Sequence, residues 1–270
     1  MDYTQASGHG TDANGNRCFV DRDDTKGING TDLVEADLNA WMNEIINIIK
    51  WGGLTPDASD LGQAVKAIAA WVNARPRGML TFGASGTFTV PADVFSVEYE
   101  LWGAGGAAGG SVGSGGAGAG GGAGAYVRGK LSVTPGQEIS VIIGKGGVGT
   151  NGADGTSGGS SFIGSDIKAI GGSYGTAGVN TTSNGWGLGG KASGGNININ
   201  GYPGQGATSL TSTTAISGQG GGSFGGGPSF SISVKGNGAG GTYPGGGGSG
   251  SVGDGYTGGA GSDGACIFRW

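Results

Sequence analysis

The chain has almost none of the residues from which proteins build catalytic and metal sites. It contains one histidine, His9, and two cysteines, Cys18 and Cys266. A single histidine argues against a Ser-His-Asp arrangement and most zinc ligand sets. The carboxylates of the C-terminal part are isolated in the sequence, whereas a glycosidase needs two that face one cleft. We therefore expect no enzyme, no catalytic residue, no metal and no cofactor. We interpret both cysteines as free thiols, with a disulfide between them as the alternative.

Charged residues and long apolar runs are also scarce. The 14 Lys and Arg residues stand singly, and the formal net charge is -5. A nucleic-acid-binding face needs clustered basic residues, so we expect no nucleic acid partner. No apolar run reaches the length of a membrane span, which argues against membrane insertion. The first ten residues are polar and lack the apolar region of a signal peptide.

Glycine is what the chain has in excess, and its distribution is uneven. Nine of the 70 glycines lie in residues 1–82, which leaves 61 for residues 83–270. Large apolar side chains are sparse among these glycines, so an ordinary core of Leu, Ile and Val cannot be built from them. Glycine backbones can instead approach closely as polyglycine II helices, which have three residues per turn and no internal hydrogen bonds. Their N–H and C=O groups must then bond to neighbouring helices.

Strand-like segments frame the glycine-rich part. Val97, Tyr99 and Leu101 alternate with acidic residues, and the chain ends in a strand-like run at 265–270. A weaker strand is expected at 230–234. Together with the shift in composition, these patterns predict a mixed fold of two domains. An N-terminal α-helical segment (1–78) precedes a β and polyglycine-II glycine-rich domain (79–270) that is bracketed by β-strands.

Two helices are expected in the first domain, over 33–50 and roughly 57–73. In the first helix Leu38, Trp41, Ile45 and Ile48 recur at intervals of three and four residues, and further apolar residues widen the stripe. That face is too broad for a lone surface helix, so we predict that these four residues mediate oligomerisation, as in a short trimeric coiled coil. An intrachain two-helix hairpin is the alternative.

Aromatic side chains inside the glycine blocks are the best candidates for ligand contacts. Tyr and Trp on loops bind ligands at low entropic cost. The loops with the most varied chemistry are 179–186, 196–203 and 208–217. The residues predicted to bind a ligand are Tyr174, Trp186, Asn198, Tyr202, Phe230 and Tyr243. The alternative is that the rings seal the ends of a glycine bundle.

Three groups of segments together resemble bacteriophage or prophage tail-fibre proteins. The segments 21–34, 38–49 and 53–57 are similar to an N-terminal helical segment of such fibres. The segments 86–91 and 97–106 resemble the entry to their glycine-rich tip domain. The segments 131–147 and 264–270 resemble a turn and the final strand of that domain.

The resemblance implies a virion protein, made in the host cytoplasm, that forms a homotrimer. Its N-terminal region would attach to a baseplate or another tail-fibre protein. Its glycine-rich tip would bind a bacterial cell-surface receptor, either protein or glycan, through loops between polyglycine helices. A monomeric adhesin cap on another fibre protein is one alternative. A non-viral structural or ice-binding glycine-rich protein is another.

Overall fold

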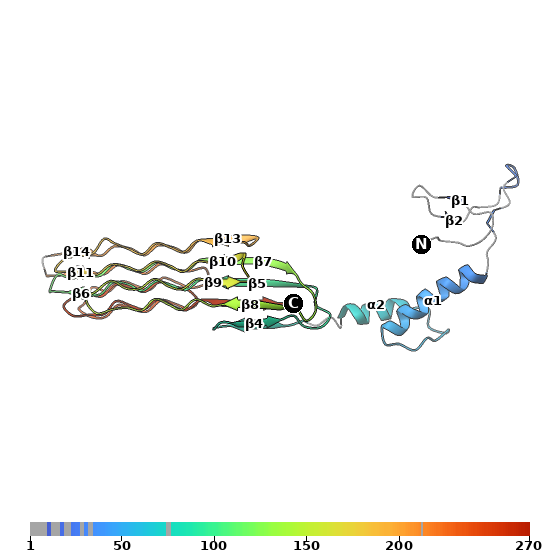
Figure 1. Ribbon diagram of the computed structural model, residues 1–270, viewed down its shortest axis with the longest axis horizontal. Helices are drawn as coiled ribbons and strands as arrows, with labels where there is room; N and C mark the ends of the chain where they lie inside the picture. The colour runs from blue at the N-terminus through green and yellow to red at the C-terminus, as the bar shows by residue number, and fades with distance from the viewer. Residues whose placement is uncertain are drawn as a thin grey trace. The chain divides into compact units, whose positions relative to one another are not determined.

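The computed structural model describes residues 10–11, 17–18, 23–27, 30–31, 35–73, 77–211 and 213–270. The chain divides into two compact units, Met1–Arg75 and Pro76–Trp270. The smaller unit has a short strand pair, β1 (Gly10–Thr11) and β2 (Arg17–Cys18), followed by two helices. The larger unit has strands and extended glycine-rich segments (Figure 1).

Helix α1 spans Glu35–Trp51 and confirms the first expected helix. It ends at Gly52 and Gly53, and Gly53 adopts a left-handed conformation with φ +77°, which glycine tolerates without strain. The proposed capping residue Asp32 lies outside the described residues. Most of the broad apolar face is exposed in the single chain, since Leu38, Trp41, Met42 and Ile45 are exposed and Ile48 is half-buried, whereas Ile49 is buried.

Helix α2 spans Gln63–Asn73 and begins six residues later than the sequence pattern indicates. The preceding residues form turns that side chains hold in place. The Asp57 carboxylate accepts a hydrogen bond from Ser59 N at 2.9 Å, and the Asp60 carboxylate accepts one from Gly62 N at 3.0 Å. The Gln63 side chain bonds to backbone groups of Thr55 and Asp57. Short polar side chains that bond to nearby backbone compete with helix formation, which explains the late start.

Two antiparallel sheets of five strands each form one end of the larger unit. The first has the order β13-β7-β5-β16-β3 and the second β12-β10-β9-β8-β4. The strands of the first sheet are β3 (Met79–Phe82), β5 (Ser96–Trp102), β7 (Tyr126–Ser132), β13 (Ile197–Ile199) and β16 (Ala265–Arg269). Those of the second are β4 (Gly86–Thr89), β8 (Glu138–Ile142), β9 (Ser161–Ile163), β10 (Ile167–Ala169) and β12 (Ala192–Ser193).

The apolar core of the larger unit lies between these sheets. Val97, Tyr99 and Leu101 of β5 point into it, as their alternation predicts. Phe88 of β4 stacks on Phe268 of β16, with ring centroids 4.3 Å apart. The last strand pairs between β3 and β5, so strands bracket the glycine-rich segments at both ends of the larger unit. Cys266 is buried in β16 as a free thiol, which confirms that part of the cysteine interpretation.

The glycine-rich segments run away from the sheets as rods whose hydrogen bonds follow a period of three residues. In the rod 103–111, the amides of Gly103, Gly106 and Gly109 donate to the rod 117–125 at 2.8–3.0 Å. The next residue of each turn donates to 153–159, and the third donates to 256–262. Each turn of three residues therefore faces three different neighbours, as the polyglycine II helix requires.

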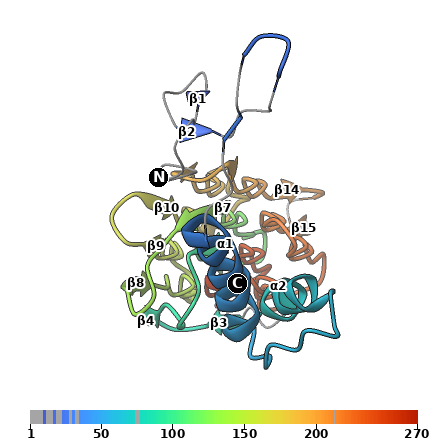
Figure 2. The same ribbon diagram turned by 90° about the vertical axis from the view of Figure 1, so that its right-hand side faces the viewer.

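Two rods, 103–111 and 117–125, lie at the centre of the bundle and are buried throughout. The first donates to the three rods named above and accepts from 144–150, 172–178 and 245–251, which gives it six neighbours. These bonds order the rods in four layers, and Figure 2 looks along them. The first layer holds 153–159, 170–178 and 183–191. The second holds 144–150, 103–111, 117–125 and 200–207. The third holds 257–264, 245–252 and 217–222, and the fourth holds 229–232 and 238–241.

Glycine is required where rods come closest. A Cβ added at Gly105 would lie 1.9 Å from Gly246 O, and one added at Gly121 would lie 2.2 Å from Gly106 O. Alanine is accommodated at other positions of the same central rods, where Ala104 and Ala123 are fully buried. The interruptions of the glycine blocks by Ala therefore do not prevent regular packing.

The segment 230–234, expected to be a strand, instead runs as a rod beside 217–220, with Ser217 N donating to Ile232 O at 2.9 Å.

Candidate functional site

The two ends of the larger unit differ in what they present. One end carries the two sheets, and the chain enters and leaves there, since Gly78 and Trp270 exchange backbone hydrogen bonds of 3.0 and 3.1 Å. The opposite end consists of the connections between rods, where Figure 1 labels β6, β11 and β14. We call these connections the end loops. They comprise 112–116, 150–153, 179–183, 208–216, 233–236 and 252–257.

Backbone pairing fastens the end loops to one another. Strand β6 (Ser111–Val112) pairs in parallel with β11 (Gly178–Val179). Strands β14 (Thr208–Ser209) and β15 (Ala215–Ile216) form a hairpin whose turn is closed by Leu210 N donating to Thr214 O at 2.9 Å. A small apolar cluster of Ala117, Ala207, Ala215, Val252 and Ile232 lies beneath these loops.

Side chains and special backbone conformations also fix the loops. The Asp254 carboxylate accepts a hydrogen bond from Gly113 N at 2.8 Å, and Asn151 Nδ2 donates to Gly255 O at 2.7 Å. Asn180 adopts a left-handed conformation with φ 56°, and Gly113 does so with φ 82°. Asn and Gly tolerate this conformation better than other residues. The end loops therefore form one surface that hydrogen bonds fix in place, and its parts come from distant segments of the chain.

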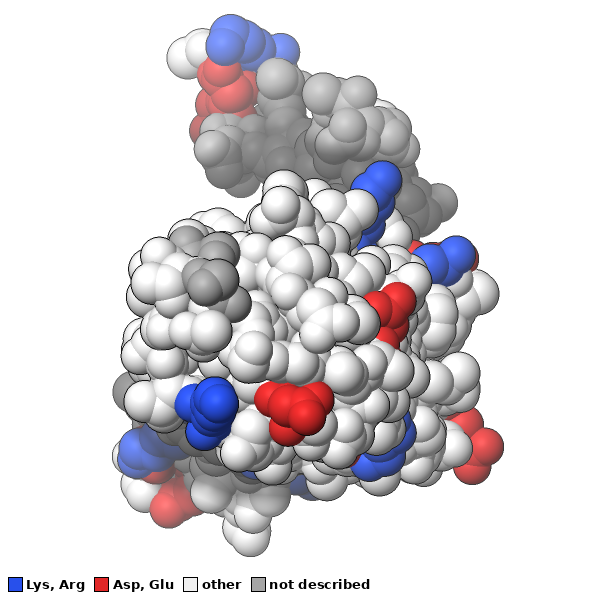
Figure 3. Space-filling model, turned by 90° about the vertical axis from the view of Figure 1, so that its left-hand side faces the viewer, with Lys and Arg blue, Asp and Glu red and all other residues white. Residues whose placement is uncertain are grey.

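The chemistry of this surface is neutral, with hydroxyl groups beside exposed aliphatic side chains. Figure 3 faces this end and shows few charged side chains on it. Within the described parts of the end loops, Lys235 and Asp254 are the charged residues. Val179, Leu210 and Val234 are exposed, and threonines are concentrated at 181–182 and 208–214. Such a surface can bind a partner by apolar contact and hydrogen bonding rather than by charge.

The structure places the predicted ligand-binding residues along the sides of the bundle and at the sheet end, outside the end loops. Tyr174, Trp186, Tyr202 and Phe230 are exposed on different rods. Tyr243 is exposed in the turn 242–245, which lies at the sheet end because Gly245 N donates to Asp263 O. Asn198 lies in β13, where its side chain exchanges hydrogen bonds with Gly195. The six residues are therefore not brought together.

Of the three loops with varied chemistry, 179–186 begins in the end loops and 208–217 contributes its hairpin there. The loop 196–203 includes β13 and lies at the sheet end. Sequence reasoning did not single out the connections at 112–116, 150–153, 233–236 and 252–257. A signal was present, because Val112, Asn151 and Lys235 interrupt or border glycine blocks at points where the chain reverses.

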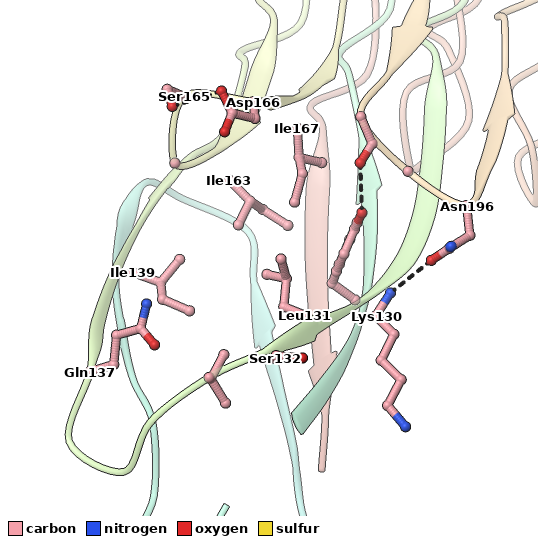
Figure 4. Close-up of a pocket in the computed structure, with 15 residues that line it drawn as sticks. Lys130, Leu131, Ser132, Gln137, Ile139, Ile163, Ser165, Asp166, Ile167 and Asn196 are labelled. Carbon is pink, nitrogen blue, oxygen red and sulfur yellow. Dashed lines mark hydrogen bonds between the residues drawn. The ribbon is translucent and has the colours of Figure 1, made fainter. Parts of the chain in front are cut away.

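A hollow of about 510 Å³ opens between the two sheets at the sheet end (Figure 4). Leu131, Ile139, Ile163 and Ile167 converge on it from both sheets. The Tyr99 hydroxyl donates to Gly194 O at 3.2 Å, and burial raises the pKa of Tyr99.

Polar groups on the rim of this hollow hold its turns. Asn196 Oδ1 accepts from Lys130 N at 3.1 Å, and Gln137 Oε1 accepts from Thr134 N at 3.1 Å. The Asp166 carboxylate accepts from Ser165 Oγ at 2.9 Å. The hollow therefore combines apolar side chains from both sheets with polar side chains at its mouth, and the polar side chains stabilise the loops.

Among the described residues, no group of three or more His, Cys, Asp and Glu side chains is placed to hold a metal ion. Within the same part of the chain, no helix combines the length and the apolar character that crossing a bilayer requires. These findings concern only the residues that the structure describes.

Fold and site together define a bundle of polyglycine II rods that is capped by a β-sandwich and has loops at the opposite end. A family model for a glycine-rich domain matches residues 81–270, and the chain belongs to this family. No curated protein matches the chain.

Proposed function

We propose that the chain is the receptor-binding protein of a bacteriophage tail fibre and is located in the virion. In this proposal the glycine-rich domain binds a host cell-surface receptor, and the N-terminal region attaches to a baseplate or another fibre protein. The observation that carries the proposal is the division of the larger unit into a sheet end, where the chain enters and leaves, and a free end made of loops. A rigid bundle with loops at one end suits the display of a binding surface.

The exposed apolar faces of the helices support self-association. Leu38, Met42 and Ile45 of α1 and Val65 and Ile68 of α2 are exposed in the single chain. Contiguous apolar surface on this scale marks an interaction site in soluble proteins. Two short helices alone cannot cover both faces, whereas three copies can pack them around a common axis. We therefore propose a homotrimer in which the helices associate.

Binding of fluorescently labelled full-length protein to a panel of bacterial strains tests the receptor-binding role. The perturbing variant replaces residues 210–214 with Gly-Ser-Gly-Ser-Gly, which removes the exposed Leu210 and the threonines beside it. The control variant is Phe95→Ala, which removes an exposed ring that precedes β5 and lies outside the end loops. The proposal predicts that some strains bind the wild-type and control proteins. These strains should not bind the loop variant. Equal binding of the loop variant, or no binding to any strain, would contradict it.

A further inference from the structure

A groove of about 330 Å³ lies along the side of the bundle, separate from the end loops. Its floor is the rod segment 219–222, and its walls come from the neighbouring segments 202–205 and 226–228. We call it the lateral groove and define it by six of its lining residues: Tyr202, Pro203, Gln205, Gln219, Gly222 and Pro228. Its volume is at the lower end of the range for small-ligand sites.

The three-residue turn of the rods explains how the groove forms. Residues three apart share one face of such a rod and lie about 9 Å apart along it. Tyr202 and Gln205 therefore share a face of one rod, and Gln219 and Gly222 share a face of the next. Backbone bonds from Tyr202 N to Gly222 O (3.3 Å) and from Gln205 N to Gln219 O (2.8 Å) set the register. The tyrosine thus lies opposite a glycine, and the two glutamines lie opposite each other.

Gly222 leaves the floor of the groove without a side chain. A Cβ added at this position would meet Pro228 N at 3.3 Å and Gly226 O at 3.4 Å, so it would lie against the wall that the segment 226–228 forms. The Tyr202 side chain is 68 % exposed, and no ring contact to it is found among the described residues. The groove therefore joins a flat aromatic face to an open floor.

The two glutamine side chains are available to a ligand. Neither the Gln205 nor the Gln219 side-chain amide forms a hydrogen bond with the described part of the chain, although Gln219 is half-buried. By contrast, Asn151 and Asn198 bond to backbone groups. A primary amide has two donors and an acceptor oxygen, and two opposed amides can bond to several hydroxyl groups of one ligand.

We infer that the lateral groove binds a neutral saccharide. A sugar ring combines hydroxyl groups, which amides recognise, with an apolar face that packs on an aromatic ring. Pro203 and Pro228 add apolar surface at the walls. None of the described residues that line the groove is charged, so it has no side chain that would neutralise an acidic sugar or a phosphate. The inference deepens receptor binding but does not depend on the end loops.

An array of bacterial O-chain oligosaccharides, neutral and acidic, tests the inference with the full-length protein. The strongest neutral binder is then titrated calorimetrically against variants. Tyr202→Ala and Gln205→Ala are expected to weaken binding about five- to tenfold each, because each removes one stacking or hydrogen-bonding group. Gly222→Ala is expected to weaken it similarly, since the methyl group occupies the floor of the groove.

Phe95→Ala is the matched control, because this exposed ring precedes β5 and does not line the groove, and it is expected to leave the affinity unchanged. Binding only of acidic saccharides, no binding at all, or binding that survives all three groove variants would overturn the inference. If saccharide binding is lost only in the variant of loop 210–214, the end loops are the glycan site and the groove is not. If the groove variants abolish saccharide binding while no strain binds the protein, the lateral groove is a saccharide site and the tail-fibre proposal is wrong.

Discussion

Adding one methyl group in the centre of the bundle should destabilise it strongly. In Gly121→Ala the new Cβ would lie 2.2 Å from Gly106 O, whereas ordinary contact begins at 3.4 Å. The rods 117–125 and 103–111 would have to separate by about 1 Å locally, since both are held in place by neighbours on every side. Their three mutual hydrogen bonds, now 2.8–3.0 Å, would then exceed the hydrogen-bonding range.

The magnitude follows from these bonds. Losing up to three hydrogen bonds costs about 1 kcal/mol each, and overpacking costs a further 1–3 kcal/mol or so. Replacing glycine also restricts the unfolded chain, which offsets roughly 0.4–1 kcal/mol. The expected net loss is on the order of 3–5 kcal/mol. For a unit of this size that corresponds to a fall in Tm of roughly 10 °C.

Gly240→Ala is the matched control. Gly240 is exposed on an outer rod, and a Cβ there would meet only Ala260 O, at 3.7 Å. This substitution should be neutral or stabilise by up to about 1 kcal/mol. Scanning calorimetry of the full chain measures both variants in the transition of the larger unit. If Gly121→Ala unfolds at the same temperature as Gly240→Ala, the close packing of the central rods described above is wrong.

Two further predictions concern ionisable groups of the larger unit. Burial of Asp263 opposes ionisation, but hydrogen bonds from Lys145 and Gly146 N outweigh it and lower its pKa. Its contribution to stability is therefore present above the unfolded pKa and is lost as the pH falls below about 4. Asp263→Asn should reduce urea stability at pH 7 and make it less sensitive to acid, and an unchanged acid profile would contradict this role. Burial raises the pKa of the Cys266 thiol. In a Cys18→Ser variant, this thiol should therefore not react with a thiol reagent at pH 8 until the protein unfolds. Rapid reaction of the native protein would contradict the buried position of Cys266 in β16.

The periodic spacing of apolar side chains predicted those helices and strands that contain such side chains. The alternation at 97–101 predicted β5, and the apolar spacing of 33–50 predicted α1. The composition also predicted polyglycine II structure, because bare glycine backbones can approach closely and bond to neighbouring rods. The start of α2 was missed because side chains of Asp57 and Asp60 stabilise turns that compete with the helix.

The neighbours of each rod could not be predicted, since backbone hydrogen bonds between glycines leave no side-chain signature in the sequence. The candidate site was harder to predict from the sequence than the fold. Aromatic rings were assigned to loops, yet a three-residue turn exposes part of every outer rod, so Tyr174 and Trp186 stand on the sides of the bundle. The lateral groove depends on register, because Gln205 and Gln219 are brought opposite each other only by the pairing of their rods.

The most direct test of the fibre proposal is the native mass of the full-length protein by light scattering. The fibre proposal predicts a trimer, with three times the 25.9 kDa of one chain, because association of the helices would bury the exposed apolar faces of α1 and α2. Ile45→Glu, which places a charge on the exposed face of α1, should shift the mass toward the monomer, whereas Asn43→Glu should leave the trimer intact. A monomeric wild-type protein would contradict the trimeric fibre and favour a monomeric cap on another fibre protein.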